Sequence, residues 1–112
     1  MLVAPYISMG YNHYAKEISL YGIIYKVTNI VNGKCYVGQT VRSVDIRWIE
    51  HLSRARSGSQ YALYNAIRKY GDVYFRIETI DTCESLEDLN RLEKYYTALY
   101  RASVDEWGYT CR

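Results

Sequence analysis

The amino-acid sequence predicts a single α+β domain in which a small, mainly antiparallel three-stranded sheet is flanked by about three helices, in the order ββααβα. Three patterns lead to this prediction: a strand–turn–strand pattern over residues 22–39, a strictly alternating segment at residues 73–78, and helical periodicity in three other segments. The chain has 112 residues, of which 49% are hydrophobic and 23% charged, which suits one hydrophobic core and argues against disorder.

Nothing in the composition points to a membrane or a secreted protein. No apolar run approaches the roughly 20 residues of a membrane span, and the N-terminus lacks a basic region followed by a long apolar core. The cysteines at positions 35, 83 and 111 are odd in number and lack the spacing of a zinc site. We therefore expect reduced thiols, no membrane partner and a cytoplasmic location.

The first two strands are predicted by a hairpin pattern. Residues 1–21 have no clean period and are expected to form an N-terminal extension of a domain that spans residues 22–112. Within that domain, two β-branched and aromatic runs flank an asparagine–glycine pair at positions 32–33, which is typical of a tight hairpin turn. The hairpin places Tyr25 and Tyr36 on neighbouring strands, where their hydroxyls can meet.

The first helix is predicted from about Ser43, its N-cap, to about Arg56. Three aliphatic side chains recur every third residue and predict its buried side: Ile46, Ile49 and Leu52. Three polar side chains then fall together on the opposite side: Arg47, His51 and Arg54.

The rest of the chain predicts a helix, a strand and a last helix. A second helix fits residues 60–70 with a glycine directly after it, and the alternating strand follows at residues 73–78. A capping-box pattern at Ser85 and Asp88 predicts a third helix that runs to about Arg101. Its expected apolar stripe consists of Leu86, Leu89, Leu92, Tyr96, Leu99 and Tyr100.

Tyrosine occurs 14 times and phenylalanine once, so many of these rings are expected to use their hydroxyl groups. Three tyrosines lie on predicted apolar stripes and are expected in the core: Tyr70, Tyr96 and Tyr100. Four others are expected at the surface or facing DNA: Tyr61, Tyr64, Tyr74 and Tyr95.

Charge is unevenly distributed along the chain. Residues 42–76 carry seven basic and three acidic side chains, whereas residues 77–111 carry three basic and eight acidic ones. A basic half beside an acidic half suits a polyanion on one face and a carboxylate-bound cation nearby. Two differently charged solvated surfaces would give the same pattern, and the net charge of +2 does not decide between them.

Several side chains are candidates for chemistry. Glu93 falls within the predicted stripe of the last helix, where a buried carboxylate needs a metal ion, an arginine or hydroxyls as partner; a glutamate at the stripe edge that reaches water is the alternative. Arg47 and His51 are four residues apart and suit one shared anion, or else an ordinary exposed face. Paired Tyr25 and Tyr36 would also stabilise a hairpin without any catalytic role.

The order of these residues is more specific than any one of them. The hairpin IIYKVTNIVNGKCYVGQT, followed by RWIEH and later by LEKYY, resembles the GIY-YIG nuclease family over roughly Gly22 to Tyr109. Tyr25 and Tyr36 match the tyrosines of the two half-motifs and are eleven positions apart, as the motif requires. The resemblance implies five catalytic residues: Tyr25, Tyr36, Arg47, His51 and Glu93.

The resemblance further implies metal-dependent hydrolysis of a DNA phosphodiester, with one strand cut per active site. Glu93 would bind one Mg²⁺ (or Mn²⁺) ion per site, Arg47 would neutralise charge on the phosphate, and a tyrosine, with Tyr25 preferred, would act on the attacking water. Four basic side chains are expected to bind DNA phosphates: Arg47, Arg54, Arg68 and Lys69.

Target recognition would come from a homodimer, or from a separate DNA-recognition domain or partner. The similarity is to phage and mobile-element members, which places the protein in a bacterial or phage-infected cell.

The sequence departs from the family pattern at two places. The first glycine of the motif falls on Ile23, with Gly22 displaced by one position, and the family's Gly-Tyr-Asn near the end of the domain is Gly-Tyr-Thr, ending in Thr110. A hydroxyl cannot span the same distance as an amide. The alternative function is therefore a catalytically weakened module of this fold that binds DNA or a protein partner without cutting.

Overall fold

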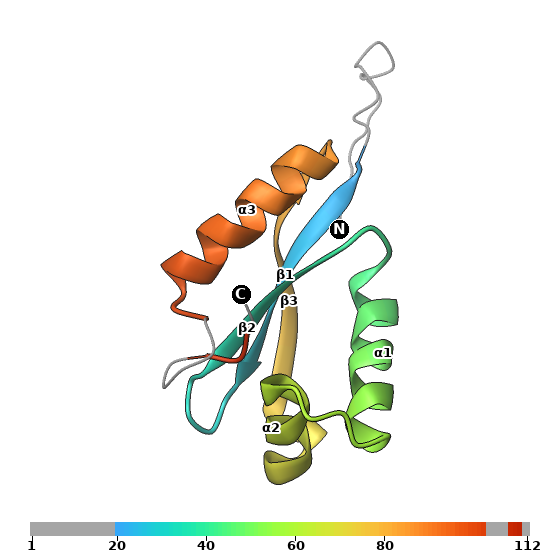
Figure 1. The fold of residues 1–112 in the computed structure, drawn as a ribbon, viewed down its shortest axis with the longest axis vertical. Helices are drawn as coiled ribbons and strands as arrows, with labels where there is room; N and C mark the ends of the chain where they lie inside the picture. The colour runs from blue at the N-terminus through green and yellow to red at the C-terminus, as the bar shows by residue number, and fades with distance from the viewer. Residues whose placement is uncertain (1–19, 103–107, 111–112) are drawn as a thin grey trace, which may run out of the picture.

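The computed structural model describes residues 20–102 and 108–110. Its elements are β1 (Gly22–Asn29), β2 (Cys35–Thr40), α1 (Val44–Arg56), α2 (Ala62–Tyr70), a 3-10 turn (Asp72–Tyr74), β3 (Phe75–Cys83) and α3 (Leu86–Leu99). The three strands form an antiparallel sheet in the order β2-β1-β3 (Figure 1). The predicted fold class and the order ββααβα are confirmed, while the expected N-terminal extension lies almost entirely outside the described residues.

The hairpin forms as predicted. Tyr25 pairs with Gly38 and Val27 with Tyr36 across β1 and β2. Gly33, in the turn, has φ +80°, a left-handed conformation that glycine adopts without steric cost. The two tyrosine side chains therefore lie diagonally across the same face of the sheet.

Each face of the sheet packs against its own core, as Figure 1 shows with α1 and α2 on one side and α3 on the other. Tyr25 and Val27 belong to the cluster formed with α1 and α2. Ile24 and Val37 belong to the cluster formed with Leu89 of α3. Alternation along the strands thus sends successive side chains into two separate cores, which gives β1 its nearly continuous burial.

The predicted buried side of α1 is wrong for two of its three residues, since only Leu52 packs against the core. Ile46 and Ile49 are 45% and 64% exposed, whereas His51 is completely buried and Ala55 nearly so. The helix turns the His51 side inward because tertiary partners satisfy both imidazole nitrogens, as described below. A count of aliphatic residues cannot detect such partners.

Smaller differences concern boundaries and tyrosines. β3 begins at Phe75 and runs to Cys83, because the chain forms a 3-10 turn at Asp72–Tyr74 before it becomes extended. Tyr64 is buried rather than at the surface, and Tyr100 is 37% exposed rather than in the core. The expected stripe of α3 also frays at both ends, where Leu86 and Leu99 are more than half exposed.

The C-terminal segment covers the free edge of β2. Gly108 bridges to Cys35 in parallel, and the Tyr109 amide donates to the Cys35 carbonyl at 2.9 Å. The Thr110 hydroxyl accepts a hydrogen bond from the Val37 amide at 2.7 Å and donates to the Val37 carbonyl at 3.2 Å. One hydroxyl therefore satisfies both polar groups of a buried edge residue.

The structure bears on two further expectations, those about the cysteines and about membrane spans. Cys35 and Cys83 are free thiols, and Cys111 lies outside the described residues. No helix in the described part of the chain is long and apolar enough to cross a membrane.

The contact of Thr110 with Val37 predicts a measurable stability loss. Thr110→Val keeps the side-chain shape but leaves the buried Val37 amide without its partner, which should lower the free energy of unfolding by about 1–3 kcal/mol. Thr79→Val, which removes an exposed hydroxyl from β3, should change it by less than about 0.5 kcal/mol. Urea denaturation of both variants measures this difference, and equal effects would contradict it.

Candidate active site

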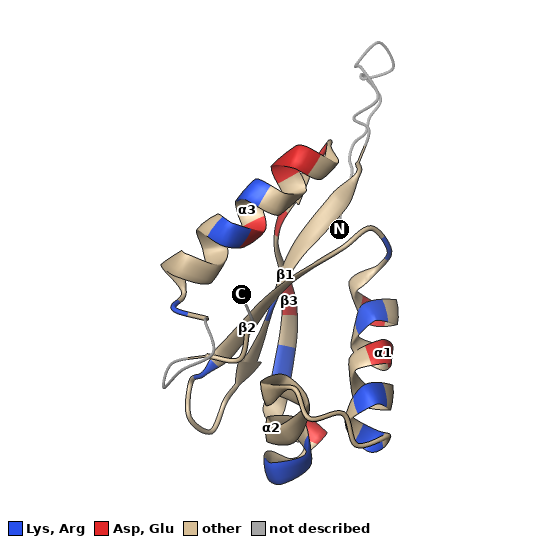
Figure 2. Cartoon of the chain, in the orientation of Figure 1, with Lys and Arg blue, Asp and Glu red and all other residues tan. Residues whose placement is uncertain are grey.

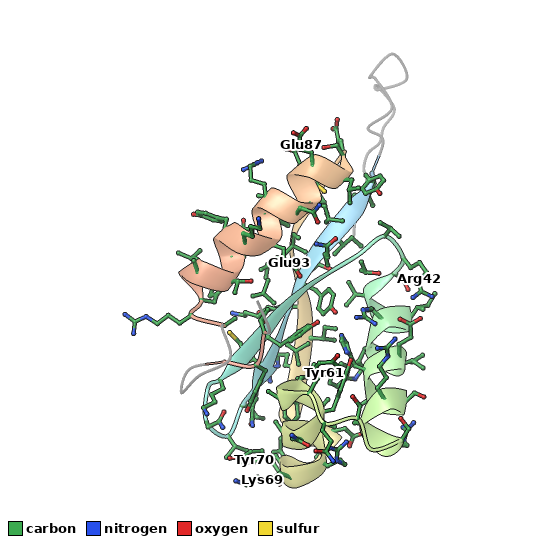
Figure 3. The ribbon with its side chains drawn as sticks, viewed as in Figure 1. Arg42, Tyr61, Lys69, Tyr70, Glu87 and Glu93 are labelled. Carbon is green, nitrogen blue, oxygen red and sulfur yellow. The ribbon has the colours of Figure 1, made fainter. Side chains whose placement is uncertain are left out.

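A pocket of about 220 Å³ lies at the β2 edge of the sheet, where side chains from both faces meet. The residues that matter for its chemistry are Tyr36, Arg47, Arg54, Tyr61, Glu93 and Thr110. Figure 3 shows Glu93 on the side of α3 that faces the sheet and Tyr61 beside the first turn of α2. Segments far apart in the sequence therefore supply one polar pocket.

The two motif tyrosines lie together but differ in access. Their ring centroids are 6.1 Å apart. Tyr36 lines the pocket, whereas Tyr25 is completely buried. Gly38 makes this arrangement possible, because a Cβ there would lie 2.5 Å from the Tyr25 hydroxyl and 2.7 Å from the Tyr36 ring. The glycine of the second half-motif is thus required by close approach of the rings.

His51 lies beneath the pocket, between two tyrosines. Its Nε2 is 2.6 Å from the Tyr25 hydroxyl and its Nδ1 is 2.8 Å from the Tyr64 hydroxyl. Burial, and after it the positive charges of Arg47 and Arg54, lowers the pKa of His51 from 6.5 to about 4. His51 is therefore neutral at pH 7, with both nitrogens occupied, and does not share an anion directly with Arg47.

The phenol groups respond to burial and to the nearby cation. Burial raises the pKa of Tyr36, while the charge of Arg47 and a hydrogen bond from Tyr25 lower it. Burial is also the largest cause of the raised pKa of Tyr25, and a charge on Tyr36 raises it further. The pKa of Tyr36 is raised overall, because burial outweighs the two lowering effects and the charge of Glu93 also raises it.

Arg47 is held in place by an acidic neighbour on the same helix. Its Nη1 donates to Glu50 Oε1 at 3.1 Å, and Arg42 donates to the other oxygen of this carboxylate. The Arg47 side chain is 21% exposed. The guanidinium is thereby fixed at the pocket wall, where it can bind a phosphate oxygen.

Glu93 is the only carboxylate among the pocket-lining residues of the described chain. Its Oε1 accepts a hydrogen bond from Gln39 Nε2 at 2.8 Å, and its other oxygen has no protein partner among the described residues. No group of three or more His, Cys, Asp or Glu side chains that could bind a metal occurs in residues 20–102 and 108–110. One open carboxylate fits Mg²⁺, which keeps several waters and needs only one or two protein carboxylates.

The predicted phosphate-binding residues separate into two groups. Arg47 and Arg54 line the pocket. Arg68 donates to the Ala55 carbonyl at 2.7 Å and so ties α2 to the end of α1, while Lys69 lies at the far end of α2 (Figure 3). Figure 2 shows basic residues gathered along α1 and at that end of α2, in line with the predicted basic half.

Sequence reasoning missed three polar residues of the site. Tyr64 bonds His51, Gln39 bonds Glu93, and Glu50 bonds Arg47. Tyr64 carried a usable signal, because it stands beside Leu63 and Ile67 on the apolar side of α2. Glu50 carried one as well, because an opposite charge three residues after Arg47 on a helix lies next to it. Gln39 carried none, since only the fold brings it near Glu93.

Tyrosine hydroxyls, an arginine and a carboxylate thus meet at one sheet edge, a set that suits catalysis on a phosphate group. Residues 21–109 match the family described as the GIY-YIG catalytic domain, so the chain belongs to this family. The chain is therefore an endonuclease of the GIY-YIG type, as the sequence resemblance implied.

Solved structures share the fold. The catalytic domain of the homing endonuclease I-TevI superposes with a TM-score of 0.71 at 20% identity, covering 81% of this chain and 98% of that one. A mutant of the catalytic domain of the intron endonuclease I-TevI gives a TM-score of 0.68 at 23% identity, covering 79% and 90%.

A sequence relative is found in a virus. The uncharacterized protein 019R of Invertebrate iridescent virus 6 is 30% identical over 81 residues, which are 70% of this chain and 29% of that protein. The chain thus spans less than a third of the length of this relative.

The close approach at Gly38 predicts a large effect of one added methyl group. Gly38→Ala forces the Tyr25 and Tyr36 rings apart and should cost about 1–3 kcal/mol in the free energy of unfolding. Gly22→Ala should cost less, because its added Cβ would come no closer than 2.9 Å to its nearest neighbour, the Leu89 side chain. Urea denaturation compares the two variants, and a Gly38→Ala protein of wild-type stability would refute the packing argument.

The buried His51 predicts a pH-dependent stability. The folded pKa of about 4 lies below the unfolded value of 6.5, so the unfolded chain binds a proton first as the pH falls. The stability supplied by neutral His51 is complete above pH 6.5 and declines by about 3 kcal/mol towards pH 4. The difference in free energy of unfolding between the wild-type protein and His51→Gln should therefore decrease as the pH falls from 6.5 to 4. NMR titration of His51 measures the folded pKa directly. A folded pKa near 6.5 would contradict the prediction.

Proposed function

We propose that this chain is the catalytic domain of a metal-dependent DNA endonuclease that hydrolyses phosphodiester bonds, one strand per active site. The observation that carries the proposal is the single pocket into which β2, α1 and α3 send Tyr36, Arg47 and Glu93. A phosphate placed there meets a cation, a carboxylate and a phenol together, which is the set that phosphoryl hydrolysis needs.

The two arginines of the pocket bind and orient the phosphate. Arg47, fixed by Glu50, donates to a non-bridging oxygen and stabilises the charge that grows on it in the transition state. Arg54, from the next-but-one turn of α1, supplies a second positive charge for an adjacent phosphate.

Glu93 is the residue that would hold one Mg²⁺ (or Mn²⁺) ion, with Gln39 keeping the carboxylate in place. When bound, the ion supplies Lewis-acid stabilisation of the phosphate oxygens and of the leaving 3′-oxygen. The unpartnered oxygen of Glu93 and the openness of the site to water support this assignment.

Access to the pocket favours Tyr36, rather than the expected Tyr25, as the phenol that contacts the attacking water. Tyr36 lines the pocket while Tyr25 is buried below it. Arg47 and the hydrogen bond from Tyr25 both lower the pKa of Tyr36 against the larger effect of burial. Tyr36 would orient the water and take its proton, with Tyr25 as its supporting donor.

One pocket accommodates one scissile phosphate, so a monomer nicks and a double-strand cut needs a second copy or a second visit. The similarity to a homing endonuclease supports an origin in a phage or mobile element, acting inside a bacterial or phage-infected cell. Target recognition would then come from a homodimer or from a separate DNA-recognition domain or partner.

A non-cutting module was the alternative suggested by Thr110. Its hydroxyl makes both hydrogen bonds to the Val37 backbone, so the polar contact between the C-terminal segment and β2 is intact. The departure at Thr110 therefore leaves the edge of β2 in place, and the cleavage assay below distinguishes the enzyme from the non-cutting module.

The proposal predicts that Glu93→Gln abolishes cleavage. Wild-type protein should relax supercoiled plasmid DNA in the presence of Mg²⁺, and the variant should nick at least about 100-fold more slowly because it no longer holds the ion. Gel electrophoresis of the plasmid over time measures both rates.

Glu87→Gln is the matched control. Glu87 lies on the same helix but at its exposed N-terminal end, so this variant should nick at the wild-type rate (Figure 3). Undiminished cleavage by Glu93→Gln would sink the assignment. Salt-sensitive DNA binding without cleavage under any divalent metal would instead support the non-cutting module.

A further inference from the structure

One buried hydroxyl next to the site has no part in the reaction as described so far. Tyr64 is 5% exposed and its hydroxyl lies 2.8 Å from His51 Nδ1. On the other side of the same ring, His51 Nε2 lies 2.6 Å from the Tyr25 hydroxyl. The three side chains form a continuous buried chain from α2 through α1 to β1.

The hydrogen bonds of this chain run in one of two directions. A neutral imidazole has one N–H and one acceptor nitrogen, so it donates to one tyrosine and accepts from the other. In the first direction, Tyr64 donates to Nδ1 and Nε2–H donates to Tyr25. In the second, Tyr25 donates to Nε2 and Nδ1–H donates to Tyr64. Only the first direction leaves the proton of Tyr25 available for Tyr36.

The surroundings of Tyr64 favour the first direction, because His51 Nδ1 is the one acceptor within hydrogen-bond distance of this buried hydroxyl among the described residues. Burial raises the pKa of Tyr64 against the lowering charges of Arg47 and Arg54, so this phenol keeps its proton at pH 7 and can donate it to Nδ1. Arg47 acts in the same way on the Tyr25 oxygen, against the larger effect of burial. Each phenol therefore keeps its own proton for the next member of the chain.

We propose that Tyr64 is a positioning residue of the active site: it donates to His51 Nδ1, holds the imidazole as the Nε2–H tautomer, and so directs the hydroxyl of Tyr25 toward Tyr36. No bond is made or broken in this chain, whose effect is to keep a hydrogen-bond donor aimed at the phenol that meets the water. The proposal rests on the proposed function in one respect, that Tyr36 is the reacting phenol.

Loss of the Tyr64 hydroxyl removes the only partner of Nδ1 among the described residues. The ring is then free to carry its proton on Nδ1, and Tyr25 turns its own proton toward Nε2. Tyr36 loses its donor although Arg47 and Glu93, which would meet the phosphate and the metal ion, are unchanged. The expected defect is therefore in the chemical step and not in DNA binding.

Two measurements test the proposal. ¹⁵N NMR of His51 in the wild-type protein without DNA should show a protonated Nε2 and an unprotonated, hydrogen-bonded Nδ1, and in Tyr64→Phe the two nitrogens should shift toward each other as both tautomers are populated. Single-turnover nicking by Tyr64→Phe should be about 10-fold slower, with an unchanged Kd for DNA. Tyr70→Phe is the matched control, because it removes a hydroxyl at the far end of the same helix and should alter neither readout (Figure 3).

Two results would overturn the proposal: a wild-type His51 protonated on Nδ1, or wild-type nicking by Tyr64→Phe. A wild-type protein that does not nick DNA would overturn the proposed function alone, because the tautomer is read in the free protein.

Discussion

The structure depends on the buried contact of His51 with Tyr25 and Tyr64. These three residues belong to α1, β1 and α2, so two hydrogen bonds join the sheet to both helices of one layer. A buried imidazole without partners would destabilise the fold, and the pairing determines which side of α1 faces inward. Arg47, one turn before His51, is thereby brought to the wall of the pocket.

The position of β2 at the sheet edge is the second constraint. Side chains of α3 could not meet those of the α1 and α2 layer across the middle of the sheet, because the strands separate the two layers. At the edge, Tyr36 on one face and Glu93 beyond the other reach the same space. The C-terminal segment then pairs with the outer side of β2, and Thr110 satisfies the Val37 backbone without closing the pocket.

Charge in the site is balanced over short distances. Glu50 lies between Arg42 and Arg47 and fixes the second without neutralising the pocket, which also holds Arg54. The opposite wall carries the single carboxylate of Glu93. This separation of cations and carboxylate suits an anionic substrate that bridges them. Burial, together with the charges of Arg47 and Arg54, lowers the pKa of His51, so the imidazole beneath the cations stays neutral.

The sequence by itself determined the hairpin, the order of the elements, the family and the five candidate residues, because turn signals, periodicity and motif spacing are local properties of the chain. Only the tertiary structure decided which side of α1 is buried, since Ile46 and Ile49 outrank His51 in any count of apolar residues. It also decided that Arg68 binds the Ala55 carbonyl and that Tyr64 completes the buried chain. The partner of a polar group comes from a distant segment, and no local pattern records which segment that is.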